Sequence, residues 1–325
     1  MYLCLTHSSR PVDFAQCALN YLTKRYALPD RLKNPPPLES LSDEYVPTYL
    51  GNVTVWKYNS GFYEKPQLVT FLEKDYKAQH AVIFDGKLII CGAAFLEIYS
   101  TNDNYIPMRM SHPWFSGGHT VFPNDSGELI VSCSASDALL IFEITTGVVK
   151  QILRMPEELY GRNYNLLSDD DLRKHYIPND LQLTHINCGY PTEKGFLVSS
   201  LIHGTIGLFD FDGKYREICT GFVGCHGVRT RPELDGFYFS DSCTGVLIEM
   251  DWNGKIIRRF SVESKWLHDC EWIYKDFYLF SLSDSNKIQM WNIRQNELFW
   301  EMDMSLYGTS VQFISHSDGE FPSNL

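Results

Sequence analysis

Five histidines recur along the chain at intervals that indicate a repeated structural unit. They are His80, His119, His185, His226 and His268, and successive positions differ by 39, 66, 41 and 42 residues. Neutral imidazole is a good ligand for zinc, copper and iron, and a histidine can also act as a nucleophile. If the repeat brings these side chains together in space, they form a chemical site that none of them forms alone.

The segment after each histidine reads as four short strands joined by turns. Asn253-Gly254 and Asp212-Gly213 precede the last strand of two of these segments, and Thr146-Gly147 takes the same place in another. Four antiparallel strands at a period near 40 residues are typical of a β-propeller blade. The interval of 66 residues then contains a normal repeat and an insertion of roughly 25 residues.

The two ends of the chain supply a sixth blade. Residues 308–315 predict its inner strand and residues 45–72 predict three further strands. Such a closure joins the ends into one ring and removes free sheet edges. The position aligned with the histidines in this blade is Thr309.

Residues 1–44 are predicted to precede the propeller as a separate segment. Within it, residues 11–26 predict a short helix, with Pro29 beyond its end, and residues 33–40 predict a stiff Pro-rich connector. The prediction is therefore an all-β, six-bladed β-propeller over residues 45–325, whose sixth blade is closed by N- and C-terminal strands.

The composition excludes several classes of protein. The net charge of −12 argues against a nucleic-acid partner and an anionic membrane surface, because both are bound through clustered Lys and Arg. No apolar run reaches the roughly 18–20 residues of a membrane helix. Nine cysteines without a CxxC pair predict reduced thiols and a cytoplasmic location. The composition does not set the oligomeric state.

The repeats resemble six-bladed propellers of the NHL-repeat and arylsulfotransferase-like kind. The resemblance is carried by "GFYFSDSCTGVLIEMDWNGKIIRRF", "GFLVSSLIHGTIGLFDFDGK" and "LHDCEWIYKDFYLFSLSDSNKIQMWN", and it covers roughly residues 45–315. Propellers of this kind include lyases, hydrolases, sulfotransferases and binding scaffolds, so the resemblance implies the fold and leaves the function open.

Inner strands of a propeller surround its axis, so residues at their starts meet near one rim. His80, His119, His185, His226 and His268 are therefore predicted to converge. Repulsion between charged imidazoles favours neutral rings there, and we predict that they bind a transition metal, namely Cu, Fe or Zn. In the alternative interpretation each ring only hydrogen-bonds to a neighbouring blade.

The connections that lead into the inner strands place further candidates at the same rim. The insertion, about residues 152–184, is a possible lid, and we predict contributions to catalysis from Arg229, Tyr164 and His112. Arg229 would pair with an anionic group of the substrate. The aromatic residues of a predicted substrate pocket are Tyr76, Trp114, Phe115, Tyr160, Phe222, Trp266 and Tyr307. These rings fit an apolar pocket, and they fit equally well as plugs between blades.

The sequence thus favours a metal-dependent enzyme that acts on a small, partly aromatic molecule on the propeller axis. It does not distinguish a lyase, cyclase, hydrolase or oxidase. Two alternatives remain open at this point. One is a metal-free, arylsulfotransferase-like enzyme with a histidine nucleophile, and the other is a non-catalytic propeller that binds a ligand or a protein.

Overall fold

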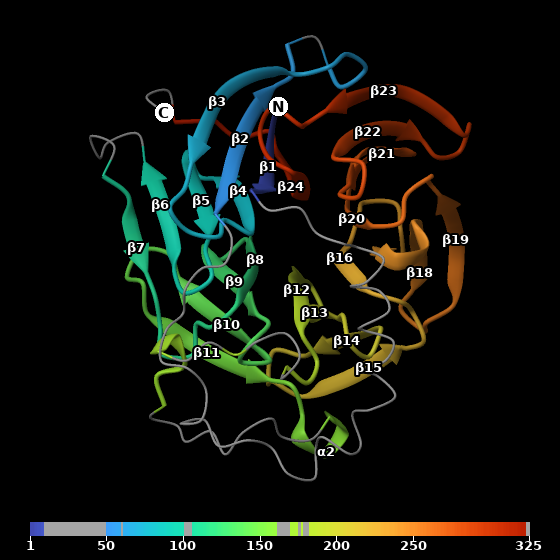
Figure 1. Ribbon diagram of the computed structural model, residues 1–325. Helices are drawn as coiled ribbons and strands as arrows, with labels where there is room; N and C mark the ends of the chain where they lie inside the picture. The colour runs from blue at the N-terminus through green and yellow to red at the C-terminus, as the bar shows by residue number, and fades with distance from the viewer. Residues whose placement is uncertain are drawn as a thin grey trace.

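The computed structural model describes residues 1–9, 50–59, 61–100, 106–160, 170–174, 177 and 182–322. Within these residues the chain forms six four-stranded antiparallel sheets arranged as a ring (Figure 1). The helix predicted at 11–26 and the connector predicted at 33–40 lie outside the described residues. No helix among the described residues is long and apolar enough to span a membrane.

Blades 1 to 5 follow one another along the chain, each from its inner to its outer strand. Blade 1 contains β4 (His80–Phe84), β5 (Lys87–Cys91), β6 (Leu96–Ser100) and β7 (Met108–Met110). Blade 2 contains β8 (Gly118–Pro123), β9 (Glu128–Cys133), β10 (Ala138–Glu143) and β11 (Val149–Arg154). Blade 3 contains β12 (Ile186–Thr192), β13 (Gly195–Ser200), β14 (Thr205–Phe209) and β15 (Tyr215–Cys219). Blade 4 contains β16 (Cys225–Arg229), β17 (Gly236–Asp241), β18 (Val246–Asp251) and β19 (Ile256–Ser261). Blade 5 contains β20 (Leu267–Tyr274), β21 (Phe277–Leu282), β22 (Lys287–Asn292) and β23 (Glu297–Asp303).

Blade 6 is built from both ends of the chain, as the sequence predicts, but its second strand comes from an unexpected place. Its order is β24 (Ser310–Ser317), β1 (Tyr2–Ser8), β2 (Gly51–Lys57) and β3 (Gln67–Glu73). The propeller therefore includes residues that the sequence analysis assigned to the preceding segment. Strand β1 is buried along five of its seven residues because it pairs with β24 on one side and β2 on the other.

Glycine turns shape the outer hairpins at the places that the sequence predicts, but the loops at Gly213 and Gly254 each have three residues instead of two. Asn253-Gly254 connects β18 to β19, where Gly254 has φ +84° and the Asp251 amide donates to the Lys255 carbonyl at 2.9 Å. The positive φ is readily adopted by glycine, which has no Cβ. Gly213 takes the same conformation between β14 and β15, with φ +84°.

The hydrophobic core is divided among the six seams between neighbouring blades. One buried cluster fills each seam, and the inner strands β4, β8, β12, β16, β20 and β24 contact one another in ring order. Blade 6 joins the ring through β1, whose Leu3 and Leu5 are fully buried in the seam with blade 5. Every blade is thus held on both faces by its neighbours.

The position of β1 makes a direct stability prediction. Replacing Leu5 with Ala leaves a cavity in the seam between blades 5 and 6, so the free energy of unfolding should fall by about 2–5 kcal/mol. The exposed Leu306, at 86% exposure, is the matched control, and its change to Ala should cost no more than about 0.5 kcal/mol. Urea unfolding of both variants measures the difference. Equal stability of the two variants would contradict the placement of β1.

Candidate functional site

The inner strands carry irregularities at the positions of the histidines. The register between inner and second strand shifts after Gly118 in blade 2, after His226 in blade 4 and after Leu267 in blade 5. Such a shift places an extra residue in the inner strand and turns the local side chain away from regular alternation. The register shifts of the backbone therefore set the direction in which the histidine side chains of these blades point.

Serines of the second strands bind the backbone groups that these shifts leave unpaired. The Ser281 hydroxyl accepts the Asp269 amide at 2.9 Å. The Ser240 hydroxyl lies 3.2 Å from the His226 carbonyl and 3.3 Å from the His268 carbonyl, and it can donate to either. Because Ser240 belongs to blade 4 and His268 to blade 5, one side chain ties the two histidine-bearing strands together.

His185 is held by an aspartate of the preceding blade. The Asp137 carboxylate accepts the backbone amides of Leu183, Thr184 and His185 at 3.2, 3.1 and 2.9 Å. These bonds favour the carboxylate, but complete burial outweighs them and raises the pKa of Asp137 to about 6. His185 itself has φ +51°, an uncommon conformation for a residue with a Cβ.

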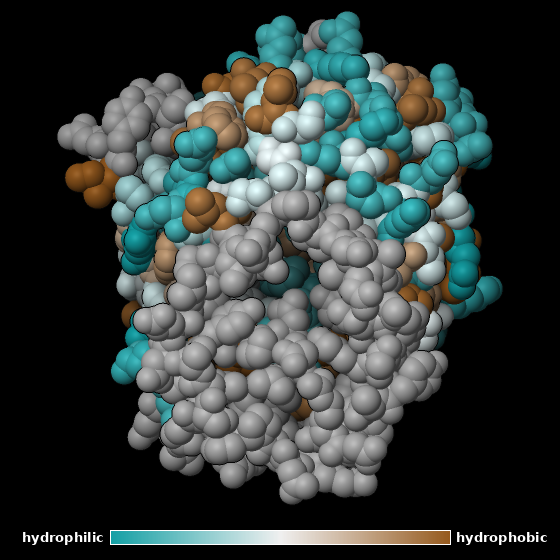
Figure 2. Space-filling view, in the orientation of Figure 1, coloured by the Kyte–Doolittle hydropathy of each residue, from teal (hydrophilic) through white to brown (hydrophobic). Residues whose placement is uncertain are grey.

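Four of the five predicted histidines come together. Ring centroids are 5.3 Å apart for His119 and His185, 6.1 Å for His119 and His226, and 4.6 Å for His226 and His268. All four side chains are buried, with at most 6% of their surface exposed. We call these four residues the histidine cluster. Figure 2 shows a hydrophilic hollow near the centre of the face that it views.

The sixth blade contributes Phe313 to this region, a residue that the sequence analysis did not single out. Its ring stands edge-on to His119, His268 and His80, with centroids 5.2, 4.7 and 5.5 Å away. Thr309, the position aligned by sequence, is exposed and precedes β24. A fully buried phenyl ring, and not Thr309, is therefore the contribution of the sixth blade beside the imidazoles.

His80 is the predicted ligand that does not join the cluster. Its Nδ1 lies 3.0 Å from the Val121 carbonyl and 3.2 Å from the Val121 amide, and its ring packs against Phe122 at 4.8 Å and against Phe313. No described ring contact joins it to the four other histidines. Burial and the positive charge of Arg229 lower its pKa to about 3.

Three rings of the histidine cluster, those of His119, His226 and His268, have lowered pKa values and are neutral at pH 7. Burial lowers the pKa of His226 to about 4, against a smaller opposing effect of the Gly224 carbonyl. Burial also lowers the pKa values of His119 and His268 well below the ordinary range, and neighbouring histidines lower them further. Removing imidazolium from water is unfavourable, so the neutral ring is the stable form.

Hydrogen bonds fix opposite tautomers on two neighbouring rings. The Nδ1 of His226 lies 2.9 Å from the Gly224 carbonyl, which can only accept, and 2.8 Å from the Ser242 hydroxyl, which can accept as well as donate. Donation to the carbonyl places the proton on Nδ1 and leaves the lone pair on Nε2. The Nδ1 of His268 accepts the Trp266 indole N–H at 3.1 Å, so its proton is on Nε2. One ring can therefore accept a proton while the other donates one.

The predicted set of five metal ligands does not fit this geometry. No described ring contact joins His80 to the cluster. The free Nε2 of His268 carries a proton, whereas a metal ligand needs a lone pair at that nitrogen. Among the described residues, no group of three or more His, Cys, Asp or Glu side chains is arranged to hold a metal ion. Metal dependence itself stays a prediction from the sequence.

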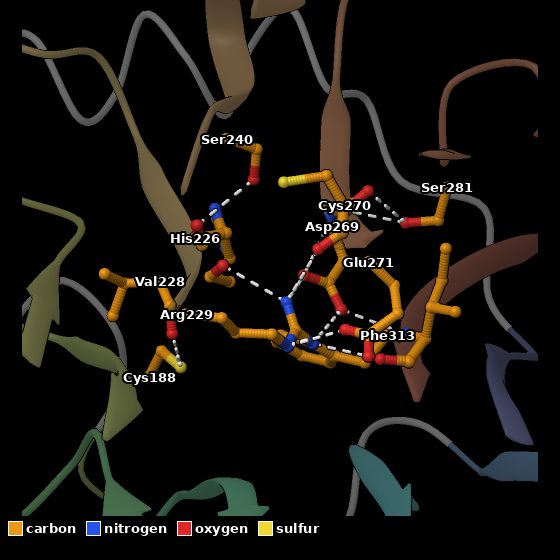
Figure 3. Close-up of polar contacts among 12 residues, drawn as sticks. Cys188, His226, Val228, Arg229, Ser240, Asp269, Cys270, Glu271, Ser281 and Phe313 are labelled. Atoms are coloured by element: carbon orange, nitrogen blue, oxygen red, sulfur yellow. Dashed lines mark hydrogen bonds and ion pairs between the residues drawn. The ribbon is translucent and has the colours of Figure 1, made fainter. Parts of the chain in front are cut away.

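Arg229 belongs to a buried ion network (Figure 3). Its guanidinium binds the Asp269 carboxylate through two hydrogen bonds of 2.6 and 2.8 Å, and its Nε lies 2.8 Å from Glu271 Oε2. It also donates to the carbonyls of Cys270 and Ile314 at 2.8 and 3.0 Å. The predicted role in anion binding is therefore replaced by a structural one, which links blades 4, 5 and 6.

The other two predicted catalytic residues do not join the cluster in the described structure. His112 lies in the connection before β8, where its Nδ1 accepts the Trp114 amide at 3.1 Å. No described contact joins it to the histidine cluster. Tyr164 lies outside the described residues.

Only one of the seven predicted pocket aromatics touches the cluster. The Trp266 ring lies 5.8 Å from the His226 ring, besides its hydrogen bond to His268. The others pack within or between blades, which is the alternative that the sequence left open. They are Tyr76, Trp114, Phe115, Tyr160, Phe222 and Tyr307.

Part of the insertion packs onto the propeller. Its described residues include α2 (Glu157–Tyr160) and the short 3₁₀ helix η2 (Leu172–Lys174). Leu172 and Ile177 are buried in the seam between blades 1 and 2, and the Leu172 amide donates to the Pro113 carbonyl at 2.8 Å. The lid role concerns residues beyond those described and stays a prediction.

Lys77 is the second residue that sequence reasoning missed. It lies in the connection between β3 and β4, and its charge contributes to the lowered pKa values of both His119 and His268. Burial lowers the pKa of Lys77 itself to about 8. A lysine three residues before a histidine carries no recognisable motif, so the sequence offered no signal for it.

Comparisons with known proteins show the same architecture. The solved structures that resemble this chain include a virginiamycin B lyase from Staphylococcus aureus, with 13% identity over 78% of this chain and 80% of that chain and a TM-score of 0.52. A catalytically inactive histidine-to-alanine variant of that lyase with quinupristin matches with 12% identity over 80% of both chains and a TM-score of 0.53. A streptogramin B lyase matches with 12% identity over 81% of both chains and a TM-score of 0.52. At these identities the likeness shows the fold, and neither a protein-family model nor a curated protein matches the chain.

The network around Arg229 predicts a large loss of stability when it is broken. Replacing Arg229 with Met leaves Asp269 and Glu271 buried without their cation, so the free energy of unfolding should fall by about 3–5 kcal/mol. Arg154 pairs with Glu157 at the surface. Replacing Arg154 with Met should lower the free energy of unfolding by at most about 1 kcal/mol. Urea unfolding compares the two variants. Equal losses would show that the buried network contributes no more than a surface pair.

The buried histidines predict a loss of stability in mild acid. The pKa values of His7, His80 and His226 are lowered by burial from 6.5 to about 3, 3 and 4. Above pH 6.5 these rings are neutral in both states, whereas below it the unfolded chain takes up protons and the folded chain does not. Stability should therefore fall as the pH drops from about 6.5 toward 4, by up to about 1.4 kcal/mol per pH unit for each ring.

Urea unfolding between pH 8 and pH 5 measures this dependence. A His7→Gln variant, whose site lies outside the histidine cluster, should lose about one third of the slope that the three rings produce. A free energy of unfolding that stays constant from pH 7 to pH 5 would contradict the neutral, buried state of these rings.

Proposed function

We propose that the protein is an enzyme that acts on a small, partly aromatic molecule by acid–base chemistry at the histidine cluster. His226 is the general base and His268 is the general acid. The reaction class that this pair supports best is an elimination, so the protein is a lyase. Metal dependence, predicted from the sequence, is not required for any proton transfer in this proposal.

The opposite tautomers of His226 and His268 are the observation that carries the proposal. An acid and a base at adjacent positions are needed whenever one bond to hydrogen and one bond to a leaving group break together. The two ring centroids are 4.6 Å apart, so both nitrogens can reach one small substrate. Both rings are neutral, which means that the base is available and the acid keeps its proton at pH 7.

The proposed elimination balances without a further reactant. The Nε2 lone pair of His226 removes a proton from a carbon atom, and the electrons of that C–H bond form a carbon–carbon double bond. The bond between the next carbon and the leaving group breaks, and the Nε2 proton of His268 passes to the leaving group. The step leaves His226 as an imidazolium and His268 as an imidazolate, and transfer of one proton from His226 Nε2 to His268 Nε2 restores both neutral rings.

The structural neighbours support this choice of reaction class. They are lyases on the same architecture, and a histidine-to-alanine change makes one of them catalytically inactive. Trp266 supplies an aromatic surface beside both proposed catalytic rings, which suits a partly aromatic substrate.

The cysteines support the cytoplasmic location that the sequence predicts. The described part of the chain contains eight cysteines, and six of them are buried. Burial raises the pKa of Cys188 to about 12, which keeps this thiol protonated and unreactive. A reducing compartment preserves such thiols.

The tautomers and the chemistry can be tested separately. Long-range ¹H–¹⁵N NMR of the wild-type protein should show a proton on Nδ1 of His226 and on Nε2 of His268. Turnover of a panel of aryl-substituted β-elimination substrates, with quinupristin as one member, should fall by about 10²- to 10⁴-fold in His226→Ala and His268→Ala. Mass spectrometry should find products whose masses sum to that of the substrate.

A His112→Ala variant is the matched control, because His112 lies outside the cluster, and it should retain turnover. Products that contain one additional water would indicate hydrolysis and overturn the elimination. Unchanged turnover in both cluster variants, or the same tautomer on both rings, would overturn the proposed roles.

A further inference from the structure

A buried serine directly follows the second strand in three of the six blades. These serines are Ser134 in blade 2, Ser242 in blade 4 and Ser283 in blade 5. The backbone amide of each one donates to a carbonyl that lies two residues before a histidine of the cluster. The accepting carbonyls are those of Gly117, Gly224 and Trp266, at 2.8, 3.2 and 3.1 Å. The repeat thus places three equivalent hydroxyls beside the strands that carry the histidines.

Of these three hydroxyls, that of Ser242 alone contacts the histidine of its own blade in the described structure. The Ser134 hydroxyl donates to the Gly117 carbonyl at 2.9 Å, and the Ser283 hydroxyl donates to the Val311 carbonyl. The Ser242 hydroxyl lies 2.8 Å from Nδ1 of His226. A position that is structural in two blades therefore meets an imidazole in the blade of the proposed base.

The Gly224 carbonyl determines the direction of this hydrogen bond. Because a carbonyl can only accept, Nδ1 of His226 supplies the proton and the Ser242 hydroxyl is its second acceptor. Two acceptors at Nδ1 stabilise the imidazolium that forms when Nε2 takes up a proton. Burial lowers the pKa of His226 to about 4 and weakens it as a base, so this stabilisation acts against the effect of burial.

The backbone around Ser242 is fixed by hydrogen bonds. Ser242 begins the short 3₁₀ helix η3 (Ser242–Thr244), which the Gly245 amide closes by donating to the Ser242 carbonyl at 3.3 Å. The Cys243 amide donates to the Val223 carbonyl at 3.1 Å, which joins η3 to the segment before His226. Since Ser242 is also fully buried, its hydroxyl holds the ring from a position that is itself held.

We propose that Ser242 is a positioning residue for His226, which holds the ring through Nδ1 and strengthens Nε2 as a base. The inference rests on the proposed function, because it adds a supporting residue to the proposed general base. Ser242 acts through the far side of the ring, and its role does not require contact with the substrate.

Two substitutions separate this role from packing. Ser242→Ala removes the hydroxyl, and Ser242→Cys replaces it with a thiol that fills the space and is a weak acceptor. Ser134→Ala is the matched control, because that hydroxyl binds a carbonyl at the equivalent place in blade 2.

NMR of the His226 ring tests the inference without turnover. Long-range ¹H–¹⁵N spectra at pH 7 should show the Nδ1 proton in the wild-type protein. Its exchange with water should be at least about tenfold faster in Ser242→Ala and Ser242→Cys, because one of its two acceptors is lost or weakened. The exchange rate in Ser134→Ala should equal that of the wild type.

Turnover of the aryl-substituted panel tests the consequence for the base. In both Ser242 variants kcat should fall by about 3- to 10-fold with KM unchanged, which is the effect of one lost hydrogen bond on the transition state. Ser134→Ala should keep the kcat of the wild type.

Full kcat in Ser242→Cys would show that the serine only fills space, and it would overturn the inference. An Nδ1 proton that exchanges equally slowly in Ser242→Ala and in the wild type would overturn it as well. Either result, combined with loss of turnover in His226→Ala, leaves the proposed base intact. If no member of the panel is turned over while exchange is faster in both Ser242 variants, the proposed reaction is wrong and the hold of Ser242 on the ring stands.

Discussion

Exclusion of water from the propeller axis is the constraint on which the rest of this structure depends. Imidazolium is costly in such surroundings, so the rings that meet there are neutral. A neutral imidazole has one donor nitrogen and one acceptor nitrogen. A single hydrogen bond therefore determines which of the two carries the proton. The Gly224 carbonyl makes this choice for His226, and the Trp266 indole makes the opposite choice for His268. The chemistry of the site thus follows from burial and from two hydrogen bonds.

The same constraint explains why the charged side chains of the inner strands pair with one another in a single network. Arg229, Asp269 and Glu271 come from two neighbouring blades, and the third blade adds the Ile314 carbonyl and amide. Each charged group is therefore matched within the protein, which is the condition under which buried ions persist.

The sequence predicts the architecture well because period and turn chemistry are local properties. The His-to-His spacing and the Asn253-Gly254 turn are sufficient to define blades, and four of the five histidines do converge. The contacts that the sequence did not predict join residues that lie far apart in the chain. The apolar run of residues 2–5 was a strand signal, but nothing local pairs it with β24. Likewise, no spacing indicates that Phe313 fills the axis or that Arg229 meets carboxylates 40 residues away.

The order of strands in blade 6 has a consequence for biosynthesis. Strand β1 is made first and β24 is made after every other strand of the six sheets, yet the two are adjacent in the finished sheet. While the chain is still on the ribosome, blades 1 to 5 can form, but the inner edge of β1 has no partner. The nascent protein is thus an open arc with an unpaired strand, and it becomes a closed ring only once β24 has been made. Chaperone protection during synthesis has its clearest target at this edge.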